Sequence, residues 1–317
     1  MRTKDRRRVK TKILVKSILI VLLTVVIFFL FNKEYDYFIK RKVQAEIFKK
    51  GKSLTEIKED NDKRRNKVIE GKQLNKNFNV IESGEKYIYD VEKIKNSIEK
   101  NKGNNKKNNE KKMVFLTFDD GPSVTVTPQM LNVLKQENVK ATFFLIGKMI
   151  EGDEGSKRMV KKIFSEGHAL ANHSYSHDLK KLYPGNKINI EAFMNEINKT
   201  NQAIKKIVGQ NFNTRVIRIP GGYISRKVYN DPNLKMFESE LKRNNMYGID
   251  WNAYGQDAEI KNKNSDEIFE AVKNSVGDKE KAVILMHDTY GKEDTVKALT
   301  RIIKYLKNKG YEFRTLK

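Results

Sequence analysis

The fold of this chain can be predicted from residues 114–122, which read Val-Phe-Leu-Thr-Phe-Asp-Asp-Gly-Pro. The first five are apolar, β-branched or aromatic, as in a buried strand, and the strand ends at Gly121-Pro122 because proline cannot donate to a ladder. Asp119 and Asp120 therefore lie where a strand ends and a loop begins. Because successive side chains of a strand point to opposite faces, we expect one carboxylate to bind a metal and the other to remain free as a base. Taken alone, the motif would also suit an Asx turn after a strand.

Expected strands and helices alternate from Met113 to the C-terminus. The strands are residues 113–118, 141–146, 168–172, 215–219, 246–250, 282–286 and 311–315. The helices are residues 126–137, 156–166, 189–208, 234–244, 265–276 and 293–308. Seven βα units over about 200 residues predict an α/β fold with a parallel sheet closed into a barrel, complete or incomplete. In that architecture the chemistry belongs to the C-terminal ends of the strands.

Polar side chains follow five of these expected strands. The clusters are Asp119-Asp120, His173 with His177, Arg218 with Pro220, Asp250-Trp251 and His287-Asp288. Two histidines four residues apart on a helical turn face the same side, which is a common arrangement for zinc. Either histidine alone would more often be a hydrogen-bonded surface residue. A core or capping role could explain any single cluster, but it explains the set of five poorly.

Five ordered segments of the chain resemble the motifs of the polysaccharide deacetylases with NodB homology. They are Thr117–Pro122, His173–His177, Arg218–Gly222, Asp250-Trp251 and Leu285–His287. The resemblance covers about residues 113–316. It implies a metal-dependent carbohydrate esterase with a distorted (β/α) barrel of about seven parallel strands.

The resemblance also implies a metal site and a general base. Asp120, His173 and His177 would hold one divalent metal ion, with zinc expected. Three nitrogen and oxygen ligands leave a position open for water or substrate, as a catalytic zinc site requires. The metal would lower the pKa of its water and polarise the acetamide carbonyl. Asp119 would be the base, and Arg218 would hold it ionised because an adjacent cation favours a charged carboxylate.

The remaining motif residues are assigned by the same resemblance to the leaving amine and the acetyl group. His287 would protonate the departing amine, and Asp250 would favour the imidazolium form of His287. Trp251 and Leu285 would wall the acetyl pocket. The fold and the reaction predicted from the resemblance thus place every motif at one end of the barrel.

One position departs from the common pattern of the family. Gly221 stands where relatives often have Tyr. The oxyanion donor in the family is the backbone N–H at this position, which Gly221 still supplies. Whether Tyr223 takes the place of the missing ring is left open by the sequence.

The N-terminal third has a different composition. Residues 1–16 are a basic tail, and residues 17–32 carry no charge and have no small-residue cleavage site, which predicts an uncleaved single-pass transmembrane signal anchor. Residues 33–112 are rich in Lys, Asn and Glu and are expected to form a charged stalk or linker, with the catalytic domain at residues 113–317. The basic tail predicts a cytoplasmic N-terminus, so the catalytic domain would face the cell wall outside the membrane. A buried helix of a soluble protein is the alternative for residues 17–32.

Charge and composition limit the classes of partner. The 317 residues include 64 Lys+Arg and 40 Asp+Glu, a net charge of +24, and residues 1–112 alone hold 31 basic and 15 acidic side chains. This excess suits a protein beside an anionic membrane or wall, and it disfavours a nucleic-acid binder because the basic residues gather outside the expected domain. The absence of cysteine excludes disulfides and thiolate metal sites. Of the four histidines, His168 opens a strand and is expected to be structural.

The resemblance favours a hydrolase that removes acetyl groups from N-acetylglucosamine in a cell-wall polysaccharide, with peptidoglycan as the expected substrate. N-acetylmuramic acid, chitin oligomers and exported poly-N-acetylglucosamine are alternatives within the same class. A catalytically inactive glycan-binding relative is the alternative from a different class. The presence of every expected ligand and proton donor disfavours that last possibility.

Overall fold

The computed structural model describes residues 78–100, 111–259 and 263–317. The chain divides into two units, Met1–Gly71 and Lys72–Lys317, of which the first lies outside the described residues. The basic tail and the anchor expected at residues 17–32 therefore also lie outside them. Among the residues described, no helix combines the length and apolar character needed to cross a membrane.

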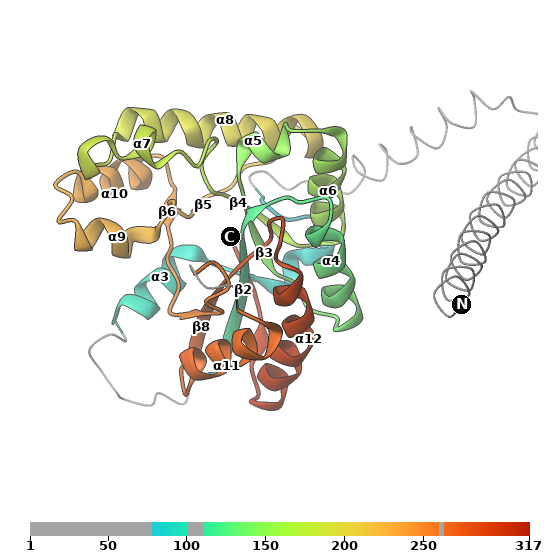
Figure 1. The fold of residues 1–317 in the computed structure, drawn as a ribbon. Coiled ribbons are helices and arrows are strands. Elements are labelled where there is room, and N and C mark those ends of the chain that lie inside the picture. Colours follow the sequence, from blue (N-terminus) through green and yellow to red (C-terminus); the bar gives the residue numbers. More distant parts are fainter. Residues whose placement is uncertain (1–77, 101–110, 260–262) are drawn as a thin grey trace, which may run out of the picture. The chain divides into compact units, whose positions relative to one another are not determined.

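The centre of the second unit is one parallel sheet (Figure 1). Its order is β6-β5-β4-β3-β2-β8-β7, and β9 also pairs with β2. The strands are β2 (Met113–Gly121), β3 (Thr142–Leu145), β4 (Ala169–Asn172), β5 (Val216–Ile217), β6 (Tyr247–Gly248), β7 (Ala253–Tyr254), β8 (Lys281–His287) and β9 (Glu312–Phe313). The expected parallel (β/α) architecture is confirmed, and the barrel is incomplete because β6 and β7 end the order without pairing to each other.

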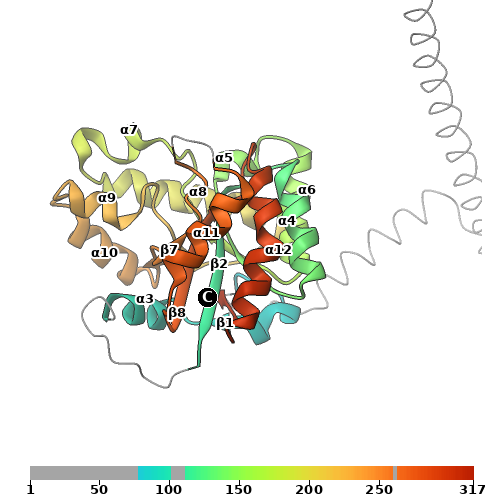
Figure 2. The same ribbon diagram turned by 60° about the horizontal axis from the view of Figure 1, so that its bottom comes forward.

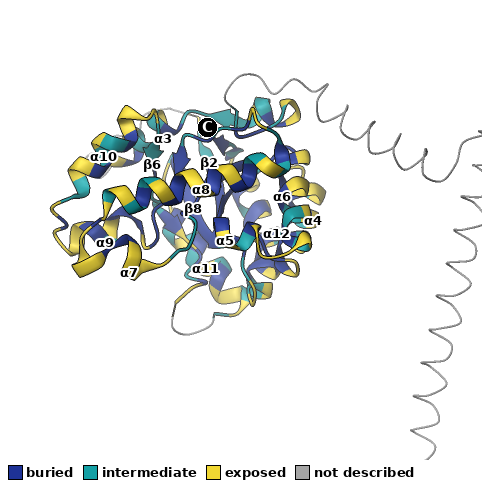
Figure 3. Cartoon of the chain, turned by 90° about the horizontal axis from the view of Figure 1, so that it is seen from above, coloured by how far each residue is buried: buried dark blue, intermediate teal, exposed yellow. Residues whose placement is uncertain are grey.

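Helices cover the outer face of this sheet, and each turns a buried stripe inward (Figure 3). The long ones are α4 (Val126–Gln136), α6 (Glu154–Ser165), α8 (Ile190–Val208), α10 (Leu234–Arg243), α11 (Ser265–Val276) and α12 (Glu293–Asn308). Short helices are α5 (Gly147–Ile150), α7 (Leu179–Leu182), α9 (Gly222–Val228), η1 (Glu82–Tyr87) and η2 (Pro184–Asn186). The long helices agree with the expected ranges within two residues. The start of α6 is earlier than expected because the side chain of Asp153 accepts a hydrogen bond from the N–H of Ser156 and caps the helix.

Side chains of β2 alternate between two apolar cores. Leu116 and Phe118 point outward into the core shared with the helices, whereas Phe115 points into the barrel. Thr117 and Asp119 lie two and four residues after Phe115, so they share its inner face and continue it toward the C-terminal end of the strand. The barrel interior is therefore apolar at one end and polar at the other.

Residues 78–100, which the sequence analysis assigned to the stalk, are folded against the sheet. The short strand β1 (Ile88–Tyr89) pairs with β10 (Thr315–Leu316), and helix α3 (Val91–Lys100) lies beside β8 (Figure 2). Val91, Ile94 and Ile98 of α3 pack into the barrel interior with Phe115. These three residues have helical spacing, but the Lys and Glu residues between them concealed the pattern. Residues 78–100 therefore belong to the folded unit and not to the stalk, so the domain start expected at Met113 lies too far along the chain.

Candidate active site

The end of β2 brings both neighbouring aspartates to the same place. The register of β2 against β3 shifts between Asp119 and Gly121, and Asp120 has a φ of 70°. His173 Nε2 lies 3.7 Å from Asp119 Oδ2 and 3.3 Å from Asp120 Oδ1. The expectation that the side chains of Asp119 and Asp120 point to opposite faces is wrong. The bulge turns Asp120 back toward the C-terminal end of the strands, which we call the mouth of the barrel.

Asp120, His173 and His177 form a cluster whose ligand atoms all lie within 4.8 Å of one another. Asp120 Oδ1 is buried without a hydrogen-bond partner, and it lies 3.5 Å from His177 Nε2. His173 Nδ1 lies 2.8 Å from the carbonyl oxygen of Arg218, so a proton on Nδ1 would leave Nε2 free to face the cluster. One carboxylate and two imidazoles with an orphaned buried oxygen fit a divalent metal ion.

The charges in this cluster act on its ligands in different directions. Burial would raise the pKa of Asp120, but the neighbouring His173, with the charges of His177 and His287, holds that pKa below its ordinary value. Asp120 therefore stays ionised at neutral pH. Burial would lower the pKa of His173, but the carboxylates of Asp119 and Asp120 raise it, so a metal ion would have to displace a proton from that ring. Burial and the charge of His173 lower the pKa of His177, which keeps its imidazole neutral and able to ligate.

The two histidines are brought together by an irregular loop and not by the helical turn that the spacing suggested. Ser174 and His177 have φ values of 65° and 53°. The buried carboxylate of Glu196 on α8 accepts hydrogen bonds from the N–H groups of Tyr175 at 3.0 Å and Ser176 at 2.6 Å. It also accepts from the hydroxyl of Ser176 at 2.8 Å. Glu196 thus fixes the shape of the loop between the two ligands, a role that the sequence analysis missed.

A signal for Glu196 was present in the sequence of α8. The residue lies in the buried stripe of that helix, between the apolar Phe193 and Ile197. A carboxylate in such a stripe requires partners, because an unpaired buried charge is costly. Lys181 provides one charged partner, with its Nζ 2.5 Å from Glu196 Oε1.

Arg218 and Asp119 lie together, as the sequence predicts. Arg218 is fully buried and donates from Nη1 to Asp119 Oδ1 and to Thr117 Oγ1, each at 2.8 Å. Its guanidinium stacks on the ring of Phe144 at 4.0 Å from the centroid. The base is therefore held in one orientation by a buried cation.

The carboxylate partner of His287 is Asp257 and not Asp250. His287 Nδ1 lies 2.8 Å from Asp257 Oδ1, and the N–H of His287 donates to Asp257 Oδ2 at 2.8 Å. Burial would lower the pKa of His287, but the hydrogen bond and charge of Asp257, with the charges of Asp119 and Asp120, raise it. Because the carboxylate can only accept, Nδ1 carries a proton and Nε2 is left for the substrate. Asp257 comes just after β7, a two-residue strand that the sequence analysis did not identify.

Asp250 instead caps the N-terminus of α9, just after Gly221. Its two carboxylate oxygens accept from the N–H groups of Tyr223 at 2.8 Å and Ile224 at 3.1 Å. Gly221 has a φ of 77°, and in the described protein no hydrogen bond leaves its N–H, which remains free as an oxyanion donor. An added Cβ at Gly222 would lie 2.9 Å from the ring of Trp251, so this position requires glycine.

Leu285 and Trp251, the residues expected to wall the acetyl pocket, both lie on the inner face of the barrel. Leu285 lies two residues before His287 on β8 and is nearly buried, and Trp251 is half-buried beside Gly222. Tyr223 points away from this region, since its hydroxyl lies against Gly248. It therefore does not replace the tyrosine that relatives often have at position 221. The roles of Trp251 and Leu285 toward an acetyl group remain predictions.

The remaining histidine is part of the core, as expected. His168 Nδ1 accepts from the N–H of Ala141 at 3.1 Å. Burial lowers the pKa of His168 to about 3, so the ring is neutral. It makes an edge contact with Phe143 and belongs to no polar cluster among the described residues.

The chain is similar in sequence and in structure to known proteins. The family model described as polysaccharide deacetylase matches residues 106–236. A peptidoglycan-N-acetylglucosamine deacetylase of Bacillus cereus is 36% identical over 209 residues, which is 64% of this chain and 66% of that protein. A second protein with the same name from that organism is 32% identical over 66% of this chain and 88% of its own length. A solved CE4 esterase of Streptococcus mutans is 35% identical, with a TM-score of 0.67 over 75% of this chain and 96% of that one.

Proposed function

Because this chain belongs to the polysaccharide deacetylase family, we propose that it hydrolyses the acetamide of N-acetylglucosamine residues in peptidoglycan. The observation that carries the proposal is the convergence of three groups at one mouth. These are the Asp120–His173–His177 cluster, the base Asp119 held by Arg218, and His287 held by Asp257. The reaction needs a base, an acid and an electrophile, and this mouth supplies a residue or residue set for each.

The protein residues divide the reaction between them. A divalent metal ion held by Asp120, His173 and His177 would supply Lewis-acid chemistry, with zinc the ion we expect. Asp119 accepts a proton from the attacking water, and Arg218 orients its carboxylate through a hydrogen bond. The N–H of Gly221 donates to the oxyanion.

His287 completes the reaction on the leaving group. It carries a proton on Nε2 and delivers it to the amine nitrogen as the C–N bond breaks. Asp257 favours the protonated ring through its hydrogen bond to Nδ1. The water oxygen goes to acetate, and the sugar keeps a free amine.

The choice of sugar rests on the names of the relatives, which act on N-acetylglucosamine in peptidoglycan. N-acetylmuramic acid in the same polymer is the alternative substrate within the class. An inactive relative would be expected to lack part of the mouth, and this chain has all the groups named above.

We also propose that residues 17–32 anchor the protein in the cell membrane with the catalytic domain outside. The support is the uncharged apolar run after a basic tail. Protease added to intact protoplasts should digest the catalytic domain, and full protection of the domain would reject this topology.

The test of the activity uses the full chain. Protein loaded with Zn²⁺ should release acetate from N-acetylglucosamine oligomers and from peptidoglycan fragments. A chelator should abolish the release, and added Zn²⁺ should restore it. Metal-loaded protein that releases no acetate from either substrate would overturn the proposal.

A further inference from the structure

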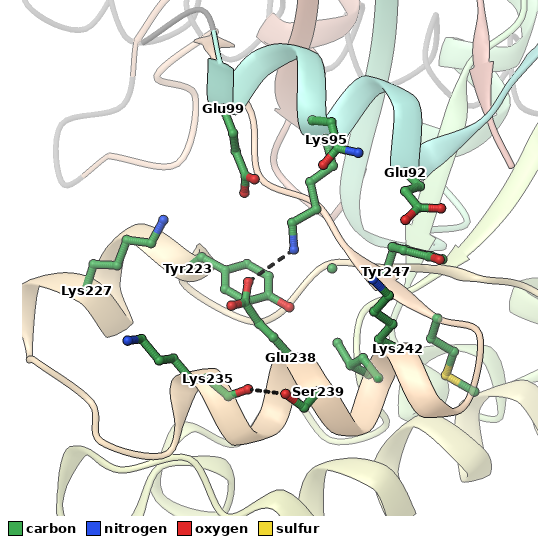
Figure 4. A pocket seen from close by; sticks show the side chains of 14 residues that line it. Glu92, Lys95, Glu99, Tyr223, Lys227, Lys235, Glu238, Ser239, Lys242 and Tyr247 are labelled. Atoms are coloured by element: carbon green, nitrogen blue, oxygen red, sulfur yellow. Dashed lines mark hydrogen bonds and ion pairs between the residues drawn. The ribbon is translucent and has the colours of Figure 1, made fainter. Parts of the chain in front are cut away.

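A groove opens on the side of the barrel that the sheet leaves unclosed. It is a cavity of about 650 Å³ between α3, α9, α10 and the edge strand β6 (Figure 4). β6 pairs with β5 on one side only, through the N–H groups of Tyr247 and Ile249. Because bonding groups alternate along a strand, the N–H of Gly248 points to the opposite edge, which lines the groove. The groove therefore contains part of an unpaired strand edge.

The charged side chains of the groove do not cancel. Glu238 is paired with Lys95 at 3.1 Å, and Glu92 is hydrogen-bonded to the hydroxyl of Tyr247. Three more cations of the lining, Lys227, Lys235 and Lys242, have no ion pair within the described part of the chain. Glu92 and Glu99 on α3 also have no ion pair among the described residues, and the lining holds four lysines and three glutamates. The groove thus has a surplus of one cation, and three of its lysines are unpaired.

Tyr223 lies within this lining with an unsatisfied hydroxyl. The residue is 5% exposed, and its hydroxyl has no hydrogen-bond partner among the described residues. Its ring lies under the ammonium group of Lys95, 5.1 Å from the centroid, in the centre of Figure 4. A buried hydroxyl without a partner costs free energy, so an acceptor that reached it past Gly248 would gain a hydrogen bond.

The groove lies close to the expected wall of the acetyl pocket. A second, small cavity of about 30 Å³ shares Lys95, Tyr223 and Lys227 with the groove and reaches Trp251. The N–H of Tyr223 also bonds Asp250, which caps α9 just after Gly221. The groove and Trp251 are therefore neighbours on the open side of the barrel.

We propose that this groove binds the carboxylate-bearing peptide stem attached to the glycan strand, next to the sugar being deacetylated. The inference rests on the proposed function and names the part of the substrate that gives specificity. Unpaired lysines and a free hydroxyl select an anionic, acceptor-rich ligand, and the N–H of Gly248 suits the carbonyl of an extended peptide. Chitin oligomers and poly-N-acetylglucosamine carry no carboxylate and would leave the groove unused.

The first experiment compares two substrates with the metal-loaded full chain. One is a glycan oligomer with peptide stems from digested peptidoglycan, and the other is a stem-free N-acetylglucosamine oligomer. The double variant Lys227→Gln, Lys235→Gln should lose about fivefold to tenfold in kcat/KM on the stem-bearing substrate only, at low salt. Lys161→Gln with Lys304→Gln is the matched control, because both are exposed lysines on α6 and α12 that remove the same charge. Equal losses on both substrates, or the same loss in the control, would overturn the proposal.

The second variant tests the hydroxyl. Tyr223→Phe removes a buried group that has no partner among the described residues, so it should keep or raise thermal stability and raise KM two- to fivefold for the stem-bearing substrate alone. An unchanged KM for that substrate would contradict the assigned role of the hydroxyl.

A binding measurement separates this inference from the proposed activity. The tripeptide L-alanyl-γ-D-glutamyl-L-lysine should bind the full chain by calorimetry and should bind the double lysine variant more weakly. If the tripeptide binds while no acetate is released from any substrate, the activity fails and the groove stands. If acetate is released while the tripeptide does not bind and the two substrates respond alike, the groove fails and the activity stands.

Discussion

Polar side chains have partners within the protein at the mouth of the barrel, whereas several in the groove at its open side have none. At the mouth, Asp119 is held by a buried arginine and His287 by Asp257, each with a hydrogen bond of 2.8 Å. In the groove, the hydroxyl of Tyr223 and the ammonium groups of Lys227 and Lys235 have no such partner in the described protein. A catalytic group must be oriented before the substrate arrives, whereas a recognition group must keep a bond free for it. The difference shows which region is organised for chemistry and which for selection.

The largest losses of activity are expected from substitutions of Asp119 and Asp120, because no other residue at the mouth can take over either role. Asp120→Asn should lose both metal and activity, because a neutral amide is a poorer ligand than a carboxylate. Asp119→Asn should keep the metal and lose about 10²–10⁴-fold in kcat, as for a lost general base. Metal analysis of the purified variants together with acetate release measures both. If Asp119→Asn strips the metal, the division of labour between these residues is wrong.

A smaller effect is expected from the residue that shapes the ligand loop. Glu196→Gln replaces an accepting oxygen with an NH₂ group beside two backbone N–H groups, so the loop should distort. We expect metal affinity to fall about 10- to 100-fold, the range for outer-shell partners of metal ligands. Competition with a chelating dye measures this affinity without reference to activity.

The control for Glu196 is Glu191→Gln, an exposed acid on the same helix. It should bind metal like the parent protein. Equal metal affinity in Glu196→Gln and the parent would show that the loop keeps its shape without Glu196, and the mouth would then be less tightly organised than the contacts indicate.

The smallest effect is a shift in pH dependence. The hydrogen bond and charge of Asp257 raise the pKa of His287 against the effect of burial, and the acid form of His287 is needed for turnover. Activity falls as pH rises through that pKa, so Asp257→Asn should move the basic limb of the kcat/KM profile to lower pH. Asp250→Asn should leave the limb in place, because Asp250 bonds the N-terminus of α9 and not His287. If the limb moves with Asp250→Asn and not with Asp257→Asn, Asp250 would be the partner of His287, as the sequence analysis expected.

The site was largely predictable because its motifs are local. Asp119, Asp120, His173, Arg218 and His287 follow strands whose apolar composition is visible within a few residues. Parallel strands bring their C-terminal ends to one edge, so knowing where the strands end was enough to group these residues. The long helices were predictable for the same reason, since their buried stripes repeat within the segment itself.

The errors concern contacts made across long distances in the chain. Asp250 and Asp257 are both acids after short strands, and only the pairing of β7 with β8 selects Asp257 as the partner of His287. The helix α3 carries few apolar residues, and its place inside the barrel depends on the gap that β6 and β7 leave. Neither choice is expressed in the periodicity of the segment concerned.

By itself, the sequence determined the succession of strands and helices, the residues at the mouth and the absence of thiolate chemistry. Those properties follow from composition and spacing over a few residues, which act locally. The tertiary structure alone decided that a bulge turns Asp120 toward the histidines, that Glu196 fixes their loop, and that α3 and β6 enclose a groove. These features depend on packing between segments far apart in the chain, where each partner is acceptable in isolation and only the assembled fold selects among them.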